Sequence, residues 1–486
     1  MSAPANEPLV VILAAGLGTR MKSRHPKVLH AICGRPMLSY VLAAASAISE
    51  RRPLVVISPA TESIRDVIGD EVDYVIQVEP RGTADAVRVA MEAADGDVKE
   101  IAVLSGDTPL LRGETVAEVL GKRRSRAAAM ALAIMIPADR RGYGRIVRGP
   151  GGVVDRIVED KDATPAERSI PEVNAGLYAF DAAWLRTRIG RIKPSAVTGE
   201  FYLTELVTLA GEDGRPAIAA AIPEEHELTG VNDRLQLSRV EATLRRRIVQ
   251  RHLLEGVGMI DPAAVYVDAS VELAPDVLLE PNVILQGTTR VGADTIIGSG
   301  SRLVDTVVGE RCRVWASVLE SSVVEDDVTI GPFSHLRRGA SIGRGAELGN
   351  FAEVKASRIG AGSKQHHFSY VGDAEVGEQV NIGAGTVTCN YDGYAKHQTV
   401  IGDRSFIGSD TMLVAPVRVG EDARTGAGAV VTHDVPPGML AVGVPARLRT
   451  PRVHEDSPGA TPDEPPSSEA GPSRRVSQTE GADPDP

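Results

Sequence analysis

The segment Leu13–Met21, Leu-Ala-Ala-Gly-Leu-Gly-Thr-Arg-Met, follows an apolar run and carries residue types that could bind a polyphosphate. Its two glycines allow backbone N–H groups to approach phosphate oxygens, and Arg20 and the nearby Lys27 can neutralise the phosphate charge. The segment lacks the Gly-Lys-Ser/Thr of a Walker loop and the third spaced glycine of a dinucleotide fingerprint. Taken alone, two glycines are more simply interpreted as a tight turn.

Asp107 is a candidate metal ligand at the same site, because the apolar run Ile101–Leu104, an expected buried strand, ends just before it. A carboxylate at the end of a buried strand could hold Mg²⁺ against a triphosphate. The alternative is that Asp107 caps a helix beginning near Pro109. Further motifs could each be simple turns, yet their joint order is hard to ascribe to turns alone: Gly82-Thr83, Tyr143-Gly144-Arg145, Glu159, Asn174-Ala175-Gly176 and Gly230-Val231-Asn232.

Two adjacent histidines, His366 and His367, lie in a segment (362–370) that interrupts the repeat described below, as does the segment 388–393. Loops that break the register of a solenoid commonly carry its binding face. A lone histidine is more often a surface residue than a base. Here the same part of the repeat also carries a polar and basic set that suits a sugar phosphate: Arg337, Lys355, Tyr370, Asn381, Asn390, Tyr391 and Lys396.

The residues that could bind a nucleotide lie in a region, from 8 to about 230, that alternates apolar runs with helical patterns. This rhythm predicts a Rossmann-like α/β domain with a mostly parallel sheet, whose ligands bind beyond the carboxyl ends of the strands. We expect helices to start near Pro36, Thr61 and Thr83. The expected strands are Leu9–Ala15, Leu54–Ile57, Tyr74–Gln77 and Ile101–Leu104, with further strands at Ala128–Ile136 and Val173–Phe180.

From about Val265 to Val431, an aliphatic residue occupies nearly every sixth position. This period suits neither a helix nor a two-sided strand, but it is typical of a parallel β-helix of stacked short strands. We expect about ten coils. A β-sandwich would instead need period-two alternation and longer strands. Two interleaved runs open the repeat: Val265, Val271, Val277 and Val283, and Val267, Leu273, Leu279 and Leu285.

The segment Arg234–Leu254 is predicted to be a helix that connects the two regions, ending at the glycines 256 and 258. Beyond Pro451 the composition turns to Pro, Ser, Glu, Asp and Gly, which indicates a disordered tail without an active-site role. The expected divisions are 1–232 for the α/β domain, 233–256 for the helical linker, 257–450 for the β-helix and 451–486 for the tail.

Composition narrows the classes of function. The net charge of −12 argues against nonspecific nucleic-acid binding. The apolar run near the N-terminus is too short to span a membrane and lacks a cleavage site, so a cytoplasmic location without a membrane partner is expected. Cys33, Cys312 and Cys389 have neither metal nor disulfide spacing, and we interpret them as reduced packing or surface residues.

The string Leu13–Met21 followed by Pro26-Lys27 resembles the signature of the sugar-1-phosphate nucleotidyltransferases. With the β-helix, residues 8 to about 447 resemble the bacterial bifunctional N-acetylglucosamine-1-phosphate uridylyltransferases/glucosamine-1-phosphate acetyltransferases. The resemblance implies a left-handed parallel β-helix, a homotrimer with acetyltransferase sites between protomers, and Mg²⁺. It also implies two coupled reactions, which use acetyl-CoA and UTP to convert glucosamine-1-phosphate to UDP-N-acetylglucosamine for cell-wall precursors.

For uridylyl transfer, the resemblance implies that Asp107 and Asn232 bind Mg²⁺, and that Lys27 and Arg20 take the triphosphate charge. The other residues that it implies are, for uracil and ribose, Leu13, Ala14, Ala15, Gly16, Gln77, Gly82 and Thr83, beside the strand end Ser105-Gly106, and, for the sugar, Gly144, Glu159 and Asn174.

For acetyl transfer, the resemblance implies that His367 is the general base, since imidazole has an ordinary pKa near the operating pH. The further residues that it implies are, for the sugar phosphate, Arg337, Lys355, Tyr370, Asn381 and Asn390, and, for acetyl-CoA, Ala384, Tyr391, Ser409 and Ala427.

The sequence departs from the family pattern at five positions. Leu17 stands where Lys is frequent, and Asp85 replaces a His near the nucleotide, which puts nucleotide preference or affinity in doubt. His366 replaces a small residue and adds a second candidate base. Arg338 replaces a Pro, and Val444 stands where some relatives carry an Arg that contacts CoA.

Two other interpretations compete with the bifunctional enzyme, and the residues present favour the enzyme over both. The chain could be a nucleotidyltransferase whose β-helix only oligomerises or regulates, as in ADP-glucose and GDP-mannose pyrophosphorylases; His367 and Asn381 argue against this. It could also be a non-catalytic scaffold, of the kind found among translation-initiation exchange-factor subunits. Such scaffolds tend to lose the metal and phosphate ligands, and Asp107, Lys27 and Asn232 are all present.

Overall fold

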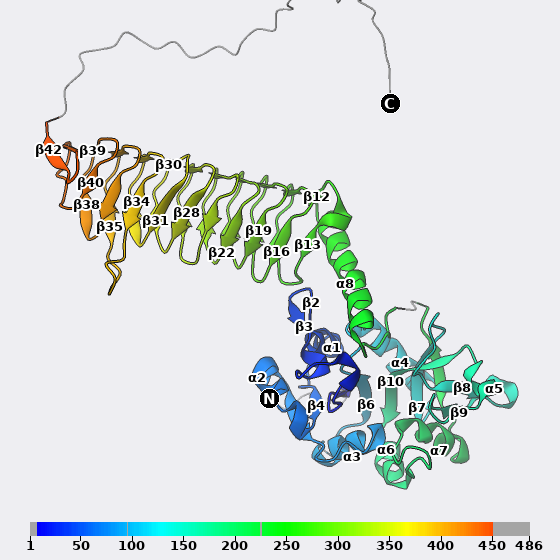
Figure 1. The fold of residues 1–486 in the computed structure, drawn as a ribbon. Coiled ribbons are helices and arrows are strands. Elements are labelled where there is room, and N and C mark those ends of the chain that lie inside the picture. The colour runs from blue at the N-terminus through cyan, green and yellow to red at the C-terminus, as the bar shows by residue number, and fades with distance from the viewer. Residues whose placement is uncertain (1–6, 95, 224–225, 451–486) are drawn as a thin grey trace, which may run out of the picture.

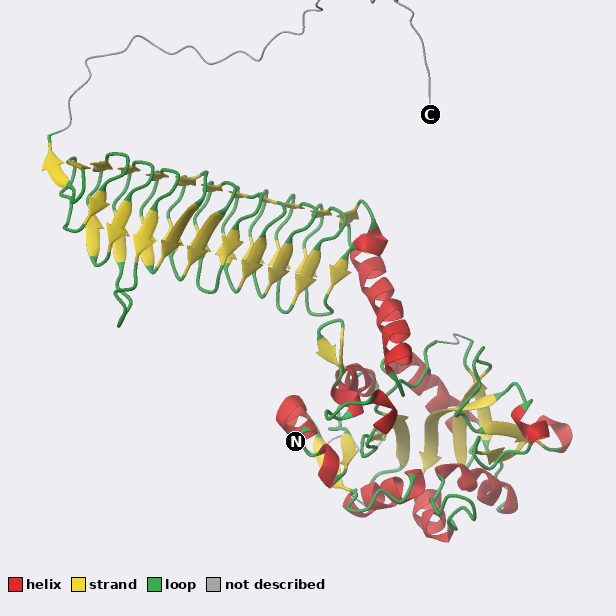
Figure 2. Cartoon of the chain, in the orientation of Figure 1, coloured by secondary structure: helices red, strands yellow, loops and turns green. Residues whose placement is uncertain are grey.

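An α/β domain and a long β-helix are joined by a single helix, α8 (Arg234–Leu254) (Figure 1). The computed structural model describes residues 7–94, 96–223 and 226–450, so the predicted disordered tail lies outside the described residues. Figure 2 shows the longer helices in the α/β domain and in α8, whereas the β-helix is built of strands and loops. Within the described residues, no helix is long and apolar enough to cross a membrane.

The α/β domain is built on a mixed sheet. Four neighbouring strands are parallel, as predicted: β6 (Glu100–Ser105), β1 (Leu9–Leu13), β4 (Leu54–Ile57) and β5 (Asp73–Ile76). In contrast, β10 (Val173–Asp181) runs antiparallel to both β6 and β7 (Met130–Met135). A short hairpin, β8 (Arg145–Arg148) and β9 (Val154–Val158), extends from β10. The strand order is β11 (Ile218–Ala221), β7, β10, β6, β1, β4 and β5.

Helices cover both faces of this sheet, which explains why its strands are continuous apolar runs rather than alternating ones. On one face lie α1 (Met37–Ser46), α2 (Ile64–Ile68) and α4 (Gly113–Ser125). On the other face lie α3 (Thr83–Ala93), α6 (Ala182–Arg188) and α7 (Leu206–Glu212). A one-turn helix, α5 (Pro165–Arg168), follows β9.

The β-helix consists of three sheets that run along the solenoid, with 12, 10 and 9 strands. Their strands are parallel except at the end of the first sheet, where β42 (Arg447–Arg449) pairs antiparallel with β41 (Leu440–Val442). The β-helix begins with β12 (Gly258–Met259), β13 (Tyr266–Val267) and β14 (Glu272–Leu273), one strand for each sheet, and ends with β42. This confirms the predicted stack of about ten coils.

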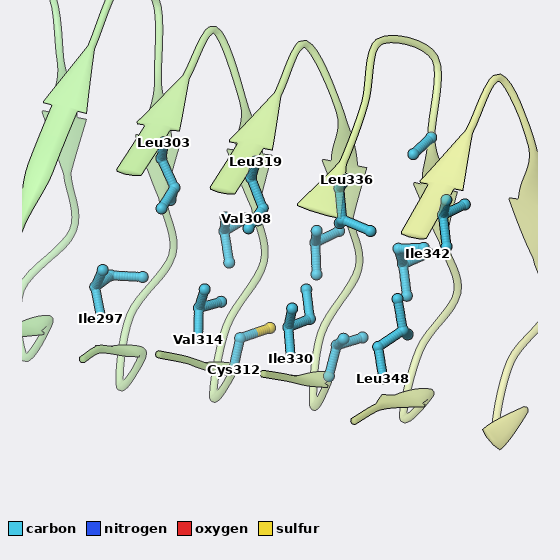
Figure 3. Close-up of a cluster of buried hydrophobic side chains, with 14 of the residues drawn as sticks. Ile297, Leu303, Val308, Cys312, Val314, Leu319, Ile330, Leu336, Ile342 and Leu348 are labelled. Atoms are coloured by element: carbon cyan, nitrogen blue, oxygen red, sulfur yellow. The ribbon is translucent and has the colours of Figure 1, made fainter. Parts of the chain in front are cut away.

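The six-residue register arises because aliphatic side chains from all three sheets point into the solenoid (Figure 3). Cys312 is buried among them, and burial raises the pKa of its thiol, in agreement with a reduced packing residue. Side chains of the first sheet are Ile297, Val314, Ile330 and Leu348, those of the second are Leu303, Leu319 and Leu336, and those of the third are Val308 and Ile342.

The linker helix α8 has the predicted bounds. Asp233 caps its first turn by accepting a hydrogen bond from the Gln236 backbone N–H (2.8 Å), and Gly256, just beyond the end, has a φ of 97°. Four of its side chains, spaced along one face, are buried: Leu237, Val240, Leu244 and Ile248.

A second connection between the domains was not predicted from the sequence. The hairpin of β2 (Ala31–Ile32) and β3 (Arg35–Pro36) extends from the α/β domain toward the first coil (Figure 1). At its tip, the Ala269 backbone N–H donates to the Cys33 carbonyl oxygen (3.0 Å). One apolar cluster therefore runs continuously from the α/β domain through α8 into the β-helix.

Candidate active sites

The carboxyl ends of β1, β5 and β6 meet at one edge of the sheet and surround a pocket of about 310 Å³. This is the position at which ligands bind in open α/β sheets. Most of the residues expected around the nucleotide line it. The lining comprises Leu13, Ala14, Ala15, Gly16, Lys27, Val28, Gln77, Pro80, Gly82, Thr83, Ala86, Ser105, Asp107 and Glu200.

The loop after β1 needs a glycine at position 18. Gly18 has a φ of 61°, and a Cβ there would lie 2.6 Å from the Cβ of Lys27. This close approach places Lys27, the first residue of a short 3₁₀ helix (Lys27–Leu29), against the loop. Gly106 supports the other side, since its backbone N–H donates to the Leu13 carbonyl oxygen (3.0 Å).

Four of the predicted side chains form one cluster of charged and polar groups. The Lys27 ammonium makes a short ion pair with Asp107 and donates to Asn232 Oδ1 (3.2 Å). Arg20 Nη2 donates to the same Asn232 oxygen (2.9 Å). The helix-cap alternative for Asp107 is wrong, because α4 begins at Gly113.

The cluster has the donor set of a magnesium site. Asp107 and Asn232 present a carboxylate oxygen and an amide oxygen to the same ammonium, and Mg²⁺ prefers ligands of these two kinds. Among the residues that the structure describes, no group of three or more His, Cys, Asp or Glu side chains could hold a metal ion. Phosphate oxygens and water would therefore complete the coordination, as is common for Mg²⁺ at nucleotide sites.

A larger cavity of about 1120 Å³ adjoins this pocket, and Thr83 and Glu200 line both. Arg20 and Glu159 also line it. Burial raises the pKa of Glu159, although a hydrogen bond from the Thr204 hydroxyl (2.9 Å) opposes that shift.

Gly144 and Asn174 lie beside Glu159. The Asn174 backbone N–H donates to the Gly144 carbonyl oxygen (2.8 Å), and a Cβ at Gly144 would lie 3.5 Å from both carboxylate oxygens of Glu159. The Asn174 side chain donates to the Tyr178 hydroxyl (2.6 Å). The three residues expected around the sugar are thus neighbours.

Sequence reasoning missed Glu200 and Tyr202, which line the larger cavity. They belong to a loop that crosses the start of α3, where the Phe201 backbone N–H donates to the Arg81 carbonyl oxygen (2.8 Å). Gly82 makes this crossing possible, because a Cβ there would lie 2.5 Å from the Phe201 carbonyl oxygen. The loop has no periodic pattern or cation run that could have identified it.

On the β-helix, the expected base and three of the expected acetyl-CoA residues lie in one column along a corner of the solenoid. His367 follows β30 (Lys364–Gln365), and Ala384, Ser409 and Ala427 occupy the matching places after β33 (Asn381–Ile382), β36 (Phe406–Ile407) and β39 (Arg424–Thr425). Backbone hydrogen bonds keep this register: Asp410 N–H donates to the Ala384 carbonyl (2.6 Å), and Gly428 N–H donates to the Ser409 carbonyl (2.8 Å). Asn381 lies in β33, three residues before this corner.

The structure distinguishes the two adjacent histidines. His366 Nε2 lies 2.8 Å from Glu347 Oε2, and Lys364 Nζ lies 3.1 Å from the other oxygen of that carboxylate. These contacts lower the pKa of Glu347, first through Lys364 and then through His366. His367 is exposed at the corner, and no ion pair is recorded for it among the described side chains.

The residues expected to bind the sugar phosphate cluster along the second sheet. Asn390 Nδ2 makes a short hydrogen bond to Asp373 and lies 3.5 Å from the Tyr370 hydroxyl. Asp373 is in turn 3.9 Å from Lys355 Nζ, so it connects Asn390 to Lys355. The neighbouring Lys355 ammonium lowers the pKa of Lys396.

Arg337 lies on the same face, paired with Glu353 (2.9 Å). Tyr391 begins the loop that projects between β34 (Val387–Cys389) and β35 (Thr399–Ile401), visible in Figure 1. His367 lies in the corner just before β31 (Ser369–Gly372), the strand that contains Tyr370.

The two halves of the chain match different family models. Residues 10–221 match the MobA-like NTP transferase domain, and residues 321–356 and 398–433 match the bacterial transferase hexapeptide (six repeats). The hexapeptide match agrees with the three sheets of a left-handed β-helix.

Relatives match nearly the whole chain. "Bifunctional protein GlmU" of Rubrobacter xylanophilus is 45% identical over 471 residues, 97% of this chain and 97% of the relative. The chain belongs to the GlmU family. The protein of the same name from Pelobacter propionicus is 44% identical, with 92% of this chain and 96% of the relative covered. That of Mycolicibacterium vanbaalenii is 44% identical, with 89% and 90% covered.

Membership of the GlmU family establishes what this protein does. It is a bifunctional enzyme of UDP-N-acetylglucosamine synthesis, with one nucleotidyltransferase and one acetyltransferase activity. It transfers acetyl from acetyl-CoA to glucosamine-1-phosphate, and then uridylyl from UTP to N-acetylglucosamine-1-phosphate. Its product feeds cell-wall precursor synthesis.

Proposed function

We propose that the two activities are divided between the two ends of the molecule. Residues 1–232 form the uridylyltransferase domain, 233–256 the helical linker, and 257–450 the acetyltransferase domain. The observation that carries this division is the separate grouping of the side chains. The cluster around Lys27 and Asp107 lies at the edge of the α/β sheet, and the column that begins at His367 lies on the β-helix.

In uridylyl transfer, a phosphate oxygen of N-acetylglucosamine-1-phosphate attacks the α-phosphorus of UTP, and the bond to the pyrophosphate leaving group breaks. No side-chain nucleophile is needed, because positioning and neutralisation of charge lower the barrier. Lys27 and Arg20 are the cations at the triphosphate. Asp107 and Asn232 would hold Mg²⁺, which supplies further positive charge to the phosphates when bound.

The substrates fit the two connected cavities. The smaller pocket, lined by Gln77, Gly82 and Thr83, takes uracil and ribose, with Leu13 to Gly16 along the other wall. The larger cavity takes the sugar phosphate beside Glu159, with Gly144 and Asn174 as its neighbours. Thr83 lines both cavities, which supports the arrangement of both substrates around one reacting phosphate.

In acetyl transfer, the amine of glucosamine-1-phosphate attacks the thioester carbonyl of acetyl-CoA, and the CoA thiolate leaves. His367 accepts the proton that the amine loses. The pairing of His366 with Glu347 supports this choice of base. The sugar phosphate is held by the cations of Arg337 and Lys355 and by the polar side chains of Tyr370, Asn381 and Asn390. The remaining contacts to acetyl-CoA come from Ala384, Tyr391, Ser409 and Ala427.

A homotrimer is the assembly we propose for these sites. Three phenylalanines, Phe333, Phe351 and Phe368, lie at the corner that carries His367, and each exposes more than half of its side chain. The rings of Phe333 and Phe351 stack, with centroids 5.4 Å apart. An exposed aromatic patch next to a predicted active site supports coverage by a neighbouring chain.

The identity of the metal and the cellular location are also part of the proposal. Mg²⁺ is the metal that suits the oxygen donors of Asp107 and Asn232. The cytoplasm is the proposed location, because UTP and acetyl-CoA are substrates found inside the cell. No nucleic-acid or membrane partner is proposed.

The division is tested by mass spectrometry of the products from pure protein, glucosamine-1-phosphate, acetyl-CoA, UTP and Mg²⁺, with each component omitted in turn. UDP-N-acetylglucosamine that requires both acetyl-CoA and UTP is the expected result. If the protein uridylylates only supplied N-acetylglucosamine-1-phosphate, the β-helix has no acetyltransferase activity. If N-acetylglucosamine-1-phosphate accumulates instead, the nucleotide site is defective.

A further inference from the structure

A buried carboxylate, Asp85, lies next to the pocket proposed for uracil and pairs with two partly exposed arginines, Arg81 and Arg88. Asp85, in the first turn of α3, is 6% exposed, and Gln77, after β5, is 2% exposed. Gln77 lines the pocket, whereas Asp85 does not line it and accepts a hydrogen bond from Gln77. Asp85 is also one of the positions at which the sequence departs from the family pattern.

The two carboxylate oxygens of Asp85 have different partners. Oδ1 accepts from Arg88 Nη2 (2.7 Å) and from Arg81 Nη2 (3.2 Å). Oδ2 accepts from Gln77 Nε2 (2.8 Å). Burial alone would raise the pKa of Asp85, but hydrogen bonds from Gln77 and Arg88 and the charges of Arg81 and Arg88 lower it. The group is therefore a carboxylate at neutral pH, which accepts hydrogen bonds and donates none.

These contacts fix the orientation of the Gln77 amide. Its nitrogen faces Asp85 Oδ2 and the Gly82 carbonyl oxygen (3.2 Å), so both of its N–H groups are used. The opposite orientation would place the amide oxygen against a carboxylate and a carbonyl, two acceptors. No hydrogen-bond donor to Gln77 Oε1 is recorded within the described part of the chain.

We propose that Asp85 is a positioning residue that sets the nucleotide preference: it holds the Gln77 amide so that only its oxygen is free to read the base. This rests on the proposed function, in which the pocket holds the base of UTP. The pairing edge of uracil has a single donor, N3–H, between two carbonyl oxygens. An amide oxygen can accept from N3–H, whereas the N3 of cytosine presents a lone pair and is repelled.

The substitution Asp85→Asn tests this directly. Arg81 and Arg88 are expected to hold the new amide oxygen at the position of Oδ1, which places the new amide nitrogen opposite Gln77 Nε2. Two donors would then face each other, so Gln77 is expected to turn over, give up its longer hydrogen bond to the Gly82 carbonyl (3.2 Å) and present Nε2 to the base. Nε2 can donate to the N3 of cytosine, and the preference shifts from UTP toward CTP.

The measurement is kcat/KM for UTP and for CTP, with N-acetylglucosamine-1-phosphate and Mg²⁺, in the full-length protein. We expect the UTP-to-CTP ratio of Asp85→Asn to fall by about tenfold or more, mainly through KM. Asp85→Ala, which leaves only the Gly82 carbonyl to orient the Gln77 amide, is expected to lie between the wild type and Asp85→Asn. Glu92→Gln is the matched control, because Glu92 pairs with Arg88 (2.6 Å) and is 65% exposed.

Differential scanning calorimetry of the same preparations shows whether the α/β domain of each variant is folded, because acetyl transfer reports only on the β-helix. If Asp85→Asn fails to fold, Asp85→Ala decides the question. A folded variant that keeps the wild-type UTP-to-CTP ratio overturns the role of Asp85 while the proposed uridylyl transfer stands. A wild-type protein that makes neither UDP-sugar nor CDP-sugar overturns the proposed function itself.

Discussion

At the scale of single residues, Lys27 contacts both of the oxygens that we assign to Mg²⁺, on Asp107 and on Asn232. In the proposed site, Asp107 would therefore have two roles: it positions the Lys27 ammonium, and it would bind the metal. Removal of the metal and removal of the Asp107 carboxylate should affect uridylyl transfer differently, because only removal of the carboxylate also breaks the ion pair that holds Lys27.

The substitution Asp107→Asn should lower uridylyl transfer by about 100-fold or more, since positive charge at the phosphates carries much of the rate. A chelator in excess over Mg²⁺ should also stop uridylyl transfer in the wild type. Acetyl transfer should persist in both cases, as should both activities in Asp155→Asn, an exposed carboxylate of the same domain. The measurement is the rate of each half-reaction, and uridylyl transfer that is unaffected by the chelator would show the metal assignment to be wrong.

His366 and His367 offer a matched pair for the acetyl transfer. His367→Ala should lower acetyl transfer by roughly 100-fold to 10,000-fold, the usual contribution of a general base. His366→Ala removes one of the two partners of Glu347 and leaves the other, Lys364, so it should change the rate little. Uridylyl transfer should be almost unchanged in both. The reverse order of the two effects would make His366 the base.

At the scale of elements, the segments with a strong local sequence pattern were predicted correctly, and the segments held in place by isolated contacts were not. The bounds of α8 were correct, because an apolar stripe, the Asp233 cap and Gly256 all agree. The strand expected at Leu9–Ala15 ends at Leu13, since Ala14 and Ala15 are buried in the pocket wall rather than in the sheet. Because these two loop residues are apolar and continue the run of apolar residues in β1, the sequence pattern extended the predicted strand into the loop.

The hairpin at residues 31–36 and the loop that carries Glu200 could not be predicted in this way. The strands of the hairpin have two residues each, and the loop has no strand. Neither segment is therefore long enough to show a hydrophobic period in the sequence. Their places are fixed by a few backbone hydrogen bonds to distant segments: one, at Ala269, for the hairpin, and two, at Arg81 and Ala84, for the loop. The residues of both sites were found mainly through family resemblance, and the pairings of Asp85 and His366 came only from the structure.

The end of α8 contains a histidine whose burial makes stability depend on pH. His252 is 2% exposed, and its pKa is lowered by burial and by Arg251, although Glu255, 3.4 Å away, opposes the shift. The unfolded chain therefore binds this proton more readily than the folded one. Stability is present above the unfolded pKa of about 6.5 and is lost as the pH falls below it.

The thermal unfolding midpoint should accordingly fall more steeply from pH 7.5 to pH 5.5 in the wild type than in His252→Gln, which carries no titratable group there. Differential scanning calorimetry over this range measures the comparison. His335→Gln is a suitable control, because His335 is exposed on the solenoid. Equal slopes in the wild type and His252→Gln would show that His252 does not contribute.

At the scale of the whole molecule, the two catalytic domains share one continuous apolar cluster, through α8 and through the hairpin at Cys33. The hairpin begins two residues after the 3₁₀ helix that carries Lys27, so the nucleotide site and the first coil are connected by a short segment of chain. The acetyltransferase residues lie many coils away, toward the other end of the solenoid. This distance explains why substitutions in one site should leave the other reaction intact.

The proposed trimer depends on the aromatic corner of the solenoid. Phe351 is 57% exposed and stacks on Phe333, so Phe351→Lys removes little of the buried core of one chain. It does place a charge where a neighbouring chain would pack, and desolvating an unpaired charge is costly. The variant should dissociate at micromolar concentration and lose acetyl transfer by at least about tenfold, while uridylyl transfer is retained.

Sedimentation velocity and the two rate assays check this expectation together. Val307→Lys is the matched control, because Val307 is an exposed apolar residue of β20 (Val307–Val308) on the third sheet, away from the corner with His367. It should remain trimeric and active in both reactions. If Phe351→Lys remains trimeric with full acetyl transfer, the corner is not the interface. If the wild type is a monomer with full acetyl transfer, each β-helix forms its site alone.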